Sequence, residues 1–257
     1  MTAQFVDVTE IEGQKISVEQ LNRTCHRYHW AADMAMGKDA LEVACGSGPG
    51  LGLLASRAKS VCAGDISPEV LARAQQTYGD RMPLSVFAAS PLPFDDGSFD
   101  LMLLFEALYY LPDAGAFFRE VNRVLRPSGA LLLVTANKDL YDFTPSPFST
   151  RYLGTRELQS ELAAAGFAPR FGGLTDVTQV SLRQRILRPV KMLASTLGLV
   201  PKTMRGKAFF KKLFFGRMTL MPADILGVNY KPEPLNPLSG ESADTRHKVL
   251  YCEARRL

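Results

Sequence analysis

The sequence predicts an α/β fold, a mostly parallel sheet with helices on both of its faces. Short apolar runs alternate with helical segments along most of the chain, which is the rhythm of strand–helix–strand units. The apolar run at residues 40–43 leads straight into a glycine-rich turn, and the run at 60–64 ends at Asp65. Both features place ligand-binding groups at the carboxyl ends of parallel strands, where sheets of this kind bind ligands.

The elements follow one another in a regular order. The predicted helices are residues 18–36, 51–58, 68–78, 113–125 and 155–165, and the predicted strands are 40–43, 60–64, 101–105, 130–135, 171–177 and 247–254. Thr155 is suited to cap the start of the last helix, and Gly166 is suited to follow its end.

The glycine-rich turn indicates a nucleotide-type ligand. Gly46, Gly48 and Gly50 allow the backbone to turn tightly and to expose N–H groups where the next helix begins. A dinucleotide fingerprint requires G-x-G-x-x-G, but the third position is Leu51 when counted from Gly46 and Leu53 when counted from Gly48. The pattern fits only from Gly50, inside the predicted helix, so this spacing disfavours a nicotinamide cofactor.

Three stretches together resemble the class I S-adenosylmethionine-dependent methyltransferases, in particular the small-molecule branch that includes quinone methyltransferases. The first is the turn with Glu42 before it and Asp65 after the second strand. Residues 92–100 read L-P-F-D-D-G-S-F-D, similar to the family's L-P-F-x-D-x-S-F-D, and residues 123–129 read R-V-L-R-P-S-G, similar to R-V-L-K-P-G-G. The resemblance implies a Rossmann-like, seven-stranded sheet closed by an antiparallel strand at 247–254.

The resemblance also implies S-adenosylmethionine as the cofactor. In the family, the acid at the position of Glu42 orients the methionine end of the cofactor, often through water, and the acid at the position of Asp65 holds the ribose. The positions expected to contact the cofactor in this chain are Glu42, Ala44, Gly46, Gly48, Asp65, Ile66, Ala89 and Phe105.

One position departs from the family pattern. Ala88 stands where relatives commonly have an aspartate that accepts a hydrogen bond from the adenine amino group. Adenine would then be held by backbone groups and by apolar contacts such as Ile66 and Ala89. The loss is about one hydrogen bond, or about 1 kcal/mol.

Methyl transfer from a sulfonium needs alignment and a dry pocket, and a hydroxyl or enol acceptor also benefits from a base. Candidate bases are His29 on the leading helix and, just after the strand at 101–105, Glu106 or the pair Tyr109 and Tyr110, where many relatives have two histidines. Each has a structural alternative: His29 can stack on its aromatic neighbours, and the tyrosines can line the pocket wall. Glu106 is expected to orient the loop that contains them.

The sequence predicts no metal site. His26 and His29 are three residues apart, whereas helical metal sites usually pair histidines four apart, and the sequence offers no evident third ligand.

A basic segment is the strongest charge asymmetry of the chain. Residues 183–217 contain ten Lys or Arg and no Asp or Glu. Within them, residues 205–215 place most apolar side chains on one helical arc and the cations on the other. We interpret residues 178–245 as a basic, partly helical cap insertion. The favoured interpretation is a cap whose apolar arc packs on the sheet domain while its cations remain in water. The alternative is an insertion that meets an anionic membrane or covers a lipid-like or phosphorylated substrate.

Composition is consistent with a single domain over residues 1–257, with residues 1–36 as a helical segment covering the cofactor site. The four cysteines form no C-x-x-C pair, which indicates reduced thiols, and residues 1–15 lack a signal-peptide pattern. We expect a cytoplasmic protein that is at most peripheral to the inner face of a membrane. The net charge of +4 and the lack of a recognised motif disfavour nucleic acid as a partner.

The favoured function is methyl transfer to a small-molecule acceptor that is lipid-linked or saccharide-like. A protein that binds S-adenosylmethionine without catalysis is an alternative, and it is supported by Ala88 and by the missing histidine pair. A nicotinamide-dependent oxidoreductase is a less favoured one. No motif assigns the acceptor, the methylated atom or the oligomeric state.

Overall fold

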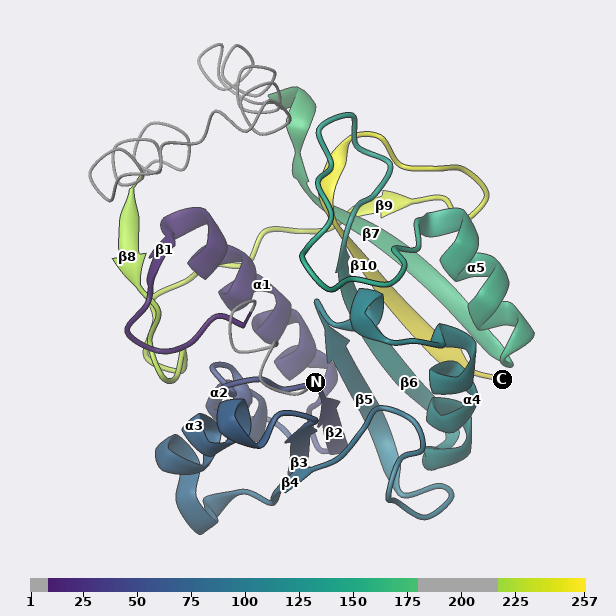
Figure 1. Ribbon diagram of the computed structural model, residues 1–257. Helices are drawn as coiled ribbons and strands as arrows, with labels where there is room; N and C mark the ends of the chain where they lie inside the picture. Colours follow the sequence, from purple (N-terminus) through teal and green to yellow (C-terminus); the bar gives the residue numbers. More distant parts are fainter. Residues whose placement is uncertain (1–8, 180–216) are drawn as a thin grey trace.

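The computed structural model describes residues 9–179 and 217–257. Their main sheet has eight strands in the order β4-β3-β2-β5-β6-β10-β7-β9 (Figure 1). The strands are β2 (Asp39–Val43), β3 (Ser60–Asp65), β4 (Leu84–Val86), β5 (Phe99–Phe105), β6 (Leu125–Ala136), β7 (Phe167–Asp176), β9 (Asn236–Leu238) and β10 (His247–Arg256). β10 pairs antiparallel with both β6 and β7, which confirms the Rossmann-like architecture with an antiparallel final strand.

The sheet differs from the expected one at its edge. Seven strands were expected, and β9 adds an eighth by pairing antiparallel with β7, Phe171 opposite Leu238. The sequence gives little sign of this strand, because β9 is three residues long and contains Pro237. Proline is tolerated at a sheet edge, where its missing N–H interrupts no inner ladder.

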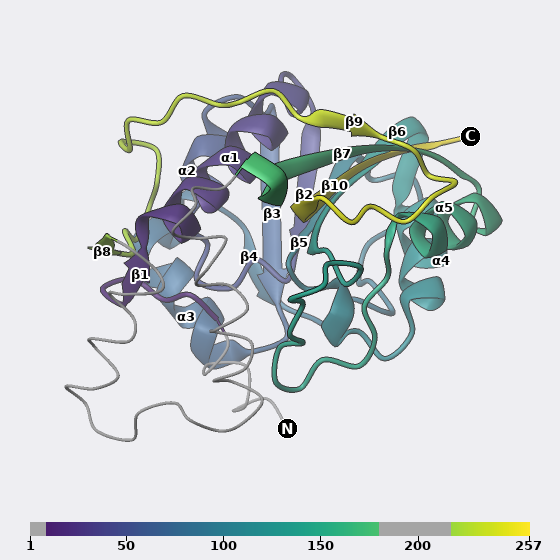
Figure 2. The same cartoon turned by 90° about the horizontal axis from the view of Figure 1, so that it is seen from above.

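Helices cover both faces of the sheet, as the alternation of segments predicts (Figure 2). They are α1 (Val18–Met34), α2 (Leu51–Ala55), α3 (Pro68–Tyr78), α4 (Ala114–Val124) and α5 (Thr155–Ala164), with short 3-10 turns η2 (Gly79–Arg81), η3 (Leu108–Tyr110) and η4 (Val177–Gln179). The first three pack in one apolar core and α4 and α5 in the other. Successive strand residues alternate between the two cores: Ala40 belongs to the first and Leu41 to the second.

The start of α5 corrects one prediction. Gly154, not Thr155, is the N-cap residue, and the Glu157 side chain accepts a hydrogen bond from the Gly154 N–H at 3.1 Å. The Thr155 hydroxyl is used elsewhere, because it donates to the Ser242 carbonyl at 2.6 Å in a distant part of the chain. Gly166 follows the helix with a φ of +84°, as predicted.

The described part of the predicted insertion crosses the α1 side of the molecule. β8 (Met218–Leu220) pairs antiparallel with β1 (Lys15–Ser17), and residues 221–235 then run past α1 and α2 toward β9. The Ile225 N–H donates to the Pro49 carbonyl at 2.8 Å, which joins this run to the glycine-rich turn. The amphipathic helix predicted over 205–215, and the basic segment except Arg217, lie outside the described residues. Among the described residues, no helix is long and apolar enough to cross a membrane.

Candidate active site

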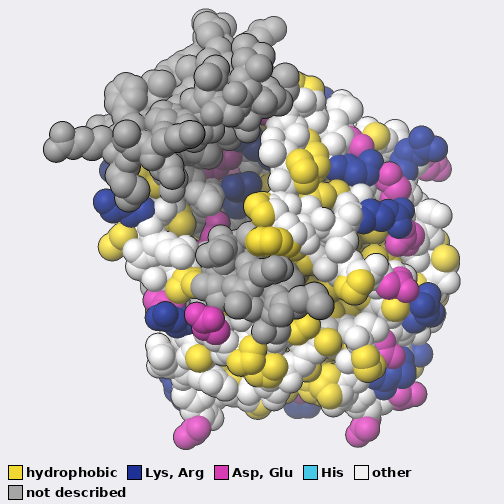
Figure 3. Space-filling view, in the orientation of Figure 1, with side chains coloured by type: hydrophobic (Ala, Val, Ile, Leu, Met, Phe, Trp, Pro, Cys, Tyr) yellow, Lys and Arg dark blue, Asp and Glu magenta, His cyan; other side chains and the backbone are white. Residues whose placement is uncertain are grey.

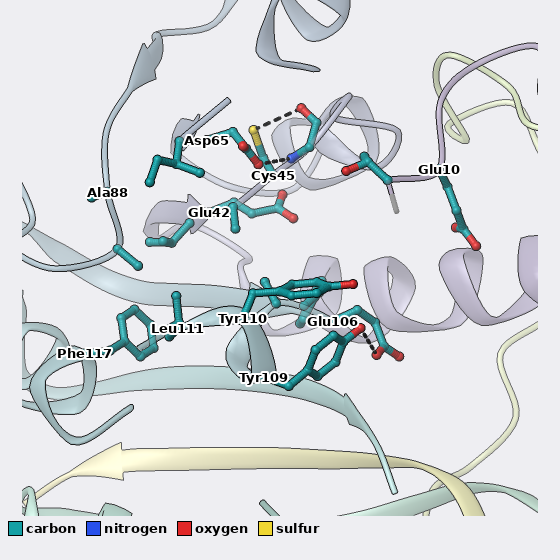
Figure 4. Close-up of a pocket in the computed structure, with 18 of the residues that line it drawn as sticks. Glu10, Glu42, Cys45, Asp65, Ala88, Glu106, Tyr109, Tyr110, Leu111 and Phe117 are labelled. Atoms are coloured by element: carbon teal, nitrogen blue, oxygen red, sulfur yellow. Dashed lines mark hydrogen bonds between the residues drawn. The ribbon is translucent and has the colours of Figure 1, made fainter. Parts of the chain in front are cut away.

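A cavity of about 560 Å³ opens at the carboxyl ends of the parallel strands (Figure 4). Val43 at the end of β2 pairs with Gly64 of β3 and Leu104 of β5, so the ends of these three strands lie level. The cavity floor is formed by the residues that follow them, and residues from the start of the described chain and from α1 form the opposite wall. Seven of the eight expected cofactor positions line this cavity, namely Glu42, Ala44, Gly46, Asp65, Ile66, Ala89 and Phe105.

The glycine-rich turn uses its first glycine for the site and the other two for packing. Gly46 has a φ of +60° and lines the cavity. Gly48, the eighth expected position, is not on the wall: a Cβ there would lie 2.7 Å from Leu51 and 3.1 Å from Ala74. A Cβ on Gly50 would overlap the ring of Tyr28. These two glycines let α1, α2 and α3 approach the turn closely.

Asp65 ties the second strand to the turn. Its carboxylate accepts hydrogen bonds from the Gly46 N–H at 3.0 Å and from the Ser67 N–H at 2.8 Å. Burial raises the pKa of Asp65, and the backbone hydrogen bonds oppose that rise. Each carboxylate oxygen can accept a further hydrogen bond. Asp65 therefore combines a structural contact with capacity for a pair of ligand hydroxyls.

Glu42 carries an unpartnered atom in the cavity wall. The side chain is 1% exposed, and Oε1 accepts a hydrogen bond from the Tyr28 hydroxyl at 2.6 Å. Oε2 is buried and has no hydrogen-bond partner. Burial raises the pKa of Glu42 to about 7, opposed by the Tyr28 hydroxyl and by the charge of Arg27. A buried acceptor left unpaired costs about 1–3 kcal/mol, so it indicates a place that a ligand completes.

Arg27 on α1 lines the same cavity and also carries an unpartnered atom. Its Nε is buried without a hydrogen-bond partner. An α-amino acid carries an ammonium, which suits the carboxylate of Glu42, and a carboxylate, which suits the guanidinium of Arg27. The two orphaned atoms therefore fit the methionine portion of S-adenosylmethionine.

Glu106 and the two tyrosines form the wall at the end of β5. Glu106 has a φ of +53°, rare for a residue with a side chain, and the Tyr109 hydroxyl donates to its Oε2 at 3.2 Å (Figure 4). Tyr109 stacks on Tyr152 with ring centroids 4.3 Å apart. The Tyr110 hydroxyl lies 2.5 Å from the Ser146 hydroxyl.

Neither tyrosine is suited to act as a base. Burial, with the nearby charge of Glu106, raises the pKa of Tyr109, and burial also raises the pKa of Tyr110. Both hydroxyls stay protonated near neutral pH, so they serve as hydrogen-bond donors and as wall.

His29 is not brought to the cavity. It lies on α1 with its ring 5.7 Å from that of Tyr230, which belongs to the run between β8 and β9. His26 is held by two hydrogen bonds, Nδ1 accepting from the Tyr251 hydroxyl at 2.9 Å and Nε2 donating to the Glu233 carbonyl at 2.8 Å. The described residues contain no cluster suited to hold a metal ion.

Several cavity residues escaped the sequence-based prediction. Gln20, Arg23 and Arg27 line the cavity from α1, and Glu10 lines it from the segment before that helix. Glu10 accepts a hydrogen bond from the Gln20 amide at 3.1 Å. The spacing of residues 20, 23 and 27 could have indicated them, because residues three and four apart lie on one side of a helix.

Comparisons with known proteins agree with the geometry. Residues 41–133 match the family described as "Methyltransferase domain". A probable S-adenosylmethionine-dependent methyltransferase of Mycobacterium tuberculosis is 35% identical over 144 residues, covering 54% of this chain and 52% of the relative. A probable phthiotriol/phenolphthiotriol dimycocerosates methyltransferase of Mycobacterium ulcerans is 39% identical over 109 residues, covering 40% of this chain and 41% of that relative. The matches thus span about half or less of these curated relatives.

The solved structures agree at the level of the fold. The YcgJ protein of Bacillus subtilis has a TM-score of 0.57 with 15% sequence identity, and the superposition covers 90% of this chain and 98% of that one. At this identity the likeness shows a shared fold.

Proposed function

Since this chain carries a class I S-adenosylmethionine-dependent methyltransferase domain, we propose that the protein transfers a methyl group from S-adenosylmethionine to a small, lipid-like acceptor. The single observation that carries the proposal is the pairing of two cavity-lining residues of opposite charge, Glu42 and Arg27, each with a buried, unpartnered polar atom, Oε2 and Nε. A site built for a neutral ligand would not leave both charged groups incomplete.

The residues present suit each part of this cofactor. Glu42 and Arg27 would hold its amino-acid end, and Asp65 would accept hydrogen bonds from the ribose hydroxyls. Ile66 and Ala89 offer apolar contact to the adenine. When bound, the cofactor supplies an electrophilic methyl group on a positively charged sulfur.

The chain itself supplies shape and exclusion of water. Tyr28 is 2% exposed, and its ring packs edge to face on Phe105 at 5.4 Å. Aromatic faces favour cations, so these rings suit a sulfonium while they keep water from it. Tyr109 and Tyr110 continue this wall toward the place of the acceptor.

An apolar acceptor is supported by the rest of the cavity. Leu111 and Phe117 line it beyond the tyrosines. Figure 3 shows hydrophobic side chains gathered in the middle of the face seen in Figure 1, with charged side chains mostly toward its margin. The Mycobacterium ulcerans relative is named for dimycocerosates as acceptors. We favour a lipid-like acceptor over a saccharide-like one on these grounds.

Peripheral attachment to an anionic membrane forms part of the proposal. Residues 183–217 carry ten cationic side chains and no anionic ones. Leu220 and Leu226, which follow that segment, are 58% and 54% exposed. A membrane-associated enzyme of this kind would reach lipid acceptors directly.

The second candidate is a protein that binds the cofactor without catalysis. It is favoured by Ala88, which lines the cavity where relatives commonly have an aspartate. A nicotinamide-dependent oxidoreductase is disfavoured by the glycine spacing. The two cofactor classes are separated by one experiment.

The test is calorimetric titration of the protein with S-adenosylhomocysteine, with NADH in parallel. We expect binding of S-adenosylhomocysteine alone. The Glu42→Gln variant should bind it at least tenfold more weakly, about 1.4 kcal/mol, because an amide cannot pair with the ammonium as a carboxylate does. Glu69→Gln is the matched control, since Glu69 is exposed and outside the cavity wall.

Binding of NADH alone would overturn the cofactor assignment. If Glu42→Gln and Glu69→Gln bound S-adenosylhomocysteine with equal affinity, Glu42 would not be part of the cofactor site. Catalysis is tested separately, by transfer of a deuterated methyl group from S-adenosylmethionine to lipid acceptors. Binding without transfer to any acceptor would favour the second candidate.

A further inference from the structure

We propose that Glu106 is the general base of the transfer and that the reacting group of the acceptor is a hydroxyl. This inference rests on the proposed function and assigns it a nucleophile. It selects Glu106 from the candidate bases that the sequence offers, in place of the loop-orienting role that the sequence analysis favoured for it.

The order of strands places Glu106 at the edge of the expected cofactor residues. Ala44, Gly46 and Asp65 follow β2 and β3, and Phe105 ends β5, the next strand in the sheet, directly before Glu106. Glu106 is thus the first ionisable group beyond the cofactor residues. Figure 4 shows it beside Tyr109, between the floor of the cavity and α1.

The other carboxylates of the cavity wall are assigned to other contacts. Glu42 accepts a hydrogen bond from Tyr28 and is placed at the amino-acid end of the cofactor, and Asp65 accepts two backbone N–H groups. Glu10 accepts hydrogen bonds from side chains of α1. Asp113 caps α4 by accepting the Ala116 N–H at 2.9 Å. The carboxylate of Glu106 accepts one hydrogen bond within the described residues, from Tyr109 to Oε2, and it has no part in the proposed cofactor contacts.

The Tyr109 contact leaves one oxygen for the acceptor. Tyr109 donates to Oε2, so Oε1 can accept a proton from a hydroxyl in the cavity. The backbone N–H of Glu106 donates to the Val134 carbonyl at 2.7 Å, which fixes the left-handed conformation of the residue. Backbone strain of this kind persists where surrounding contacts impose it and is concentrated at active sites.

The charges that face Glu106 suit a base. Burial raises the pKa of Glu106, and the cations of Arg27 and Arg23 on α1 oppose that rise, as does the Tyr109 hydroxyl. Glu10, facing it from the segment before α1, acts in the same direction as burial. The result is a carboxylate more basic than an ordinary glutamate, with two nearby cations that favour its ionised form, as suits a general base.

The step balances with the groups named. The acceptor oxygen forms a bond to the methyl carbon, the bond between that carbon and sulfur breaks, and its electron pair remains on sulfur. The hydroxyl proton passes to Oε1 of Glu106. A carboxylate acceptor would need no base and would be repelled by Glu106, and an ammonium acceptor would first have to lose a proton.

The test uses three probes that share an octyl chain: para-octylphenol, octanoic acid and octylamine. Each is titrated calorimetrically into the protein saturated with S-adenosylhomocysteine. We expect the phenol to bind at least tenfold more tightly than octanoic acid, and Glu106→Gln to abolish that preference.

Catalysis is tested with methyl-deuterated S-adenosylmethionine and the phenol. The labelled phenyl ether should form, at a rate at least 100-fold lower in Glu106→Gln than in the parent. Glu69→Gln is the matched control.

Glutamine can still accept the Tyr109 hydroxyl, so the variant should keep its fold and its affinity for S-adenosylhomocysteine. Tighter binding of octanoic acid or octylamine, undiminished ether formation by Glu106→Gln, or failure of the phenol to bind or react would each overturn the inference. A protein that does not bind S-adenosylhomocysteine at all would instead remove the proposed function on which the inference rests.

Discussion

Asp65 belongs to the proposed cofactor site and also holds the glycine-rich turn against the end of β3. One carboxylate accepts the N–H groups of Gly46 and Ser67, which lie on opposite sides of it in the sequence. The residue could be located from the sequence, because it ends an apolar run. Its two backbone contacts could not, since the turn and β3 meet only in the folded chain.

We predict that Asp65→Ala weakens S-adenosylhomocysteine binding at least tenfold, about 1.4 kcal/mol. The variant loses the ribose acceptor and leaves the Gly46 N–H without its partner. Calorimetry measures the affinity, and Asp33→Ala, an exposed change on α1, is the control. Near-native affinity of Asp65→Ala would mean that the ribose lies elsewhere.

Glu42 makes stability depend on pH. Its pKa rises from 4.5 to about 7 on folding, so the folded state binds more protons than the unfolded state between these values. The free energy of unfolding therefore falls as the pH rises through this range. We predict that Glu42→Gln is more stable than the parent above about pH 7, by on the order of 3 kcal/mol, and loses this advantage near pH 4.

Urea unfolding at several pH values measures the effect. In the proposed site the same charge also affects ligand binding, because an ammonium at the amino-acid end of the cofactor would pair with the ionised carboxylate. Affinity for S-adenosylhomocysteine should rise about tenfold between about pH 6 and about pH 8 in the parent and stay flat in Glu42→Gln. Parallel pH profiles of the two proteins would contradict both expectations.

Tyr109 is a positioning residue that acts through Glu106. Its hydrogen bond favours the ionised carboxylate and so lowers the pKa of Glu106. We predict that Tyr109→Phe raises this pKa by about one unit, as expected for the loss of a charge-assisted hydrogen bond. The acid limb of the kcat profile should move to higher pH by that amount. A lower rate with an unmoved limb would indicate a purely structural role.

At the scale of elements, the closeness of α1 to the glycine-rich turn defines the cavity. Tyr28 of α1 packs on Gly50, and its hydroxyl reaches Glu42 in β2. α1 itself begins with a capping box in which Ser17 and Gln20 satisfy each other's backbone N–H groups. The helix thereby brings Arg23 and Arg27 over the ends of the strands.

We predict that Gly50→Ala lowers the free energy of unfolding by about 1–3 kcal/mol, the usual cost of overpacking a core. The new Cβ would overlap the Tyr28 ring and displace the hydroxyl from Glu42. Both the free energy of unfolding, measured in urea, and the affinity for S-adenosylhomocysteine should decrease. Gly227→Ala is the control, because a Cβ there meets nothing within 4 Å. Equal losses in the two variants would show that the effect is not steric.

At the scale of the whole molecule, charge is distributed unevenly. The net charge is only +4, although residues 183–217 alone contain ten cations. We predict binding to phosphatidylglycerol vesicles at about 0.1 M salt and its loss at about 1 M, as the Debye length falls from about 10 Å to about 3 Å. The double variant Lys211→Glu, Lys212→Glu should bind these vesicles more weakly. The control is the double variant Lys15→Glu, Lys231→Glu, which makes the same charge change at exposed sites outside the segment.

Sedimentation with the vesicles measures the bound fraction, and phosphatidylcholine vesicles serve as the neutral reference. Equal partitioning onto the two kinds of vesicle would rule out an electrostatic membrane contact. The methyltransferase proposal would stand in that case, because it depends on the cavity and not on this segment.

The parallel strands, the glycine-rich turn, Glu42 within β2 and Asp65 at the end of β3 could be predicted from the sequence, because strand periodicity, glycine spacing and the residues near a strand's end are local properties. The rest of the site depends on contacts between distant segments. Tyr109 and Glu106 are near neighbours in sequence, but their burial depends on Tyr152 and on α1. His29 lies against Tyr230, and β9 joins β7, through contacts between segments far apart in the chain. No local pattern encodes such contacts, since each depends on how separate elements pack.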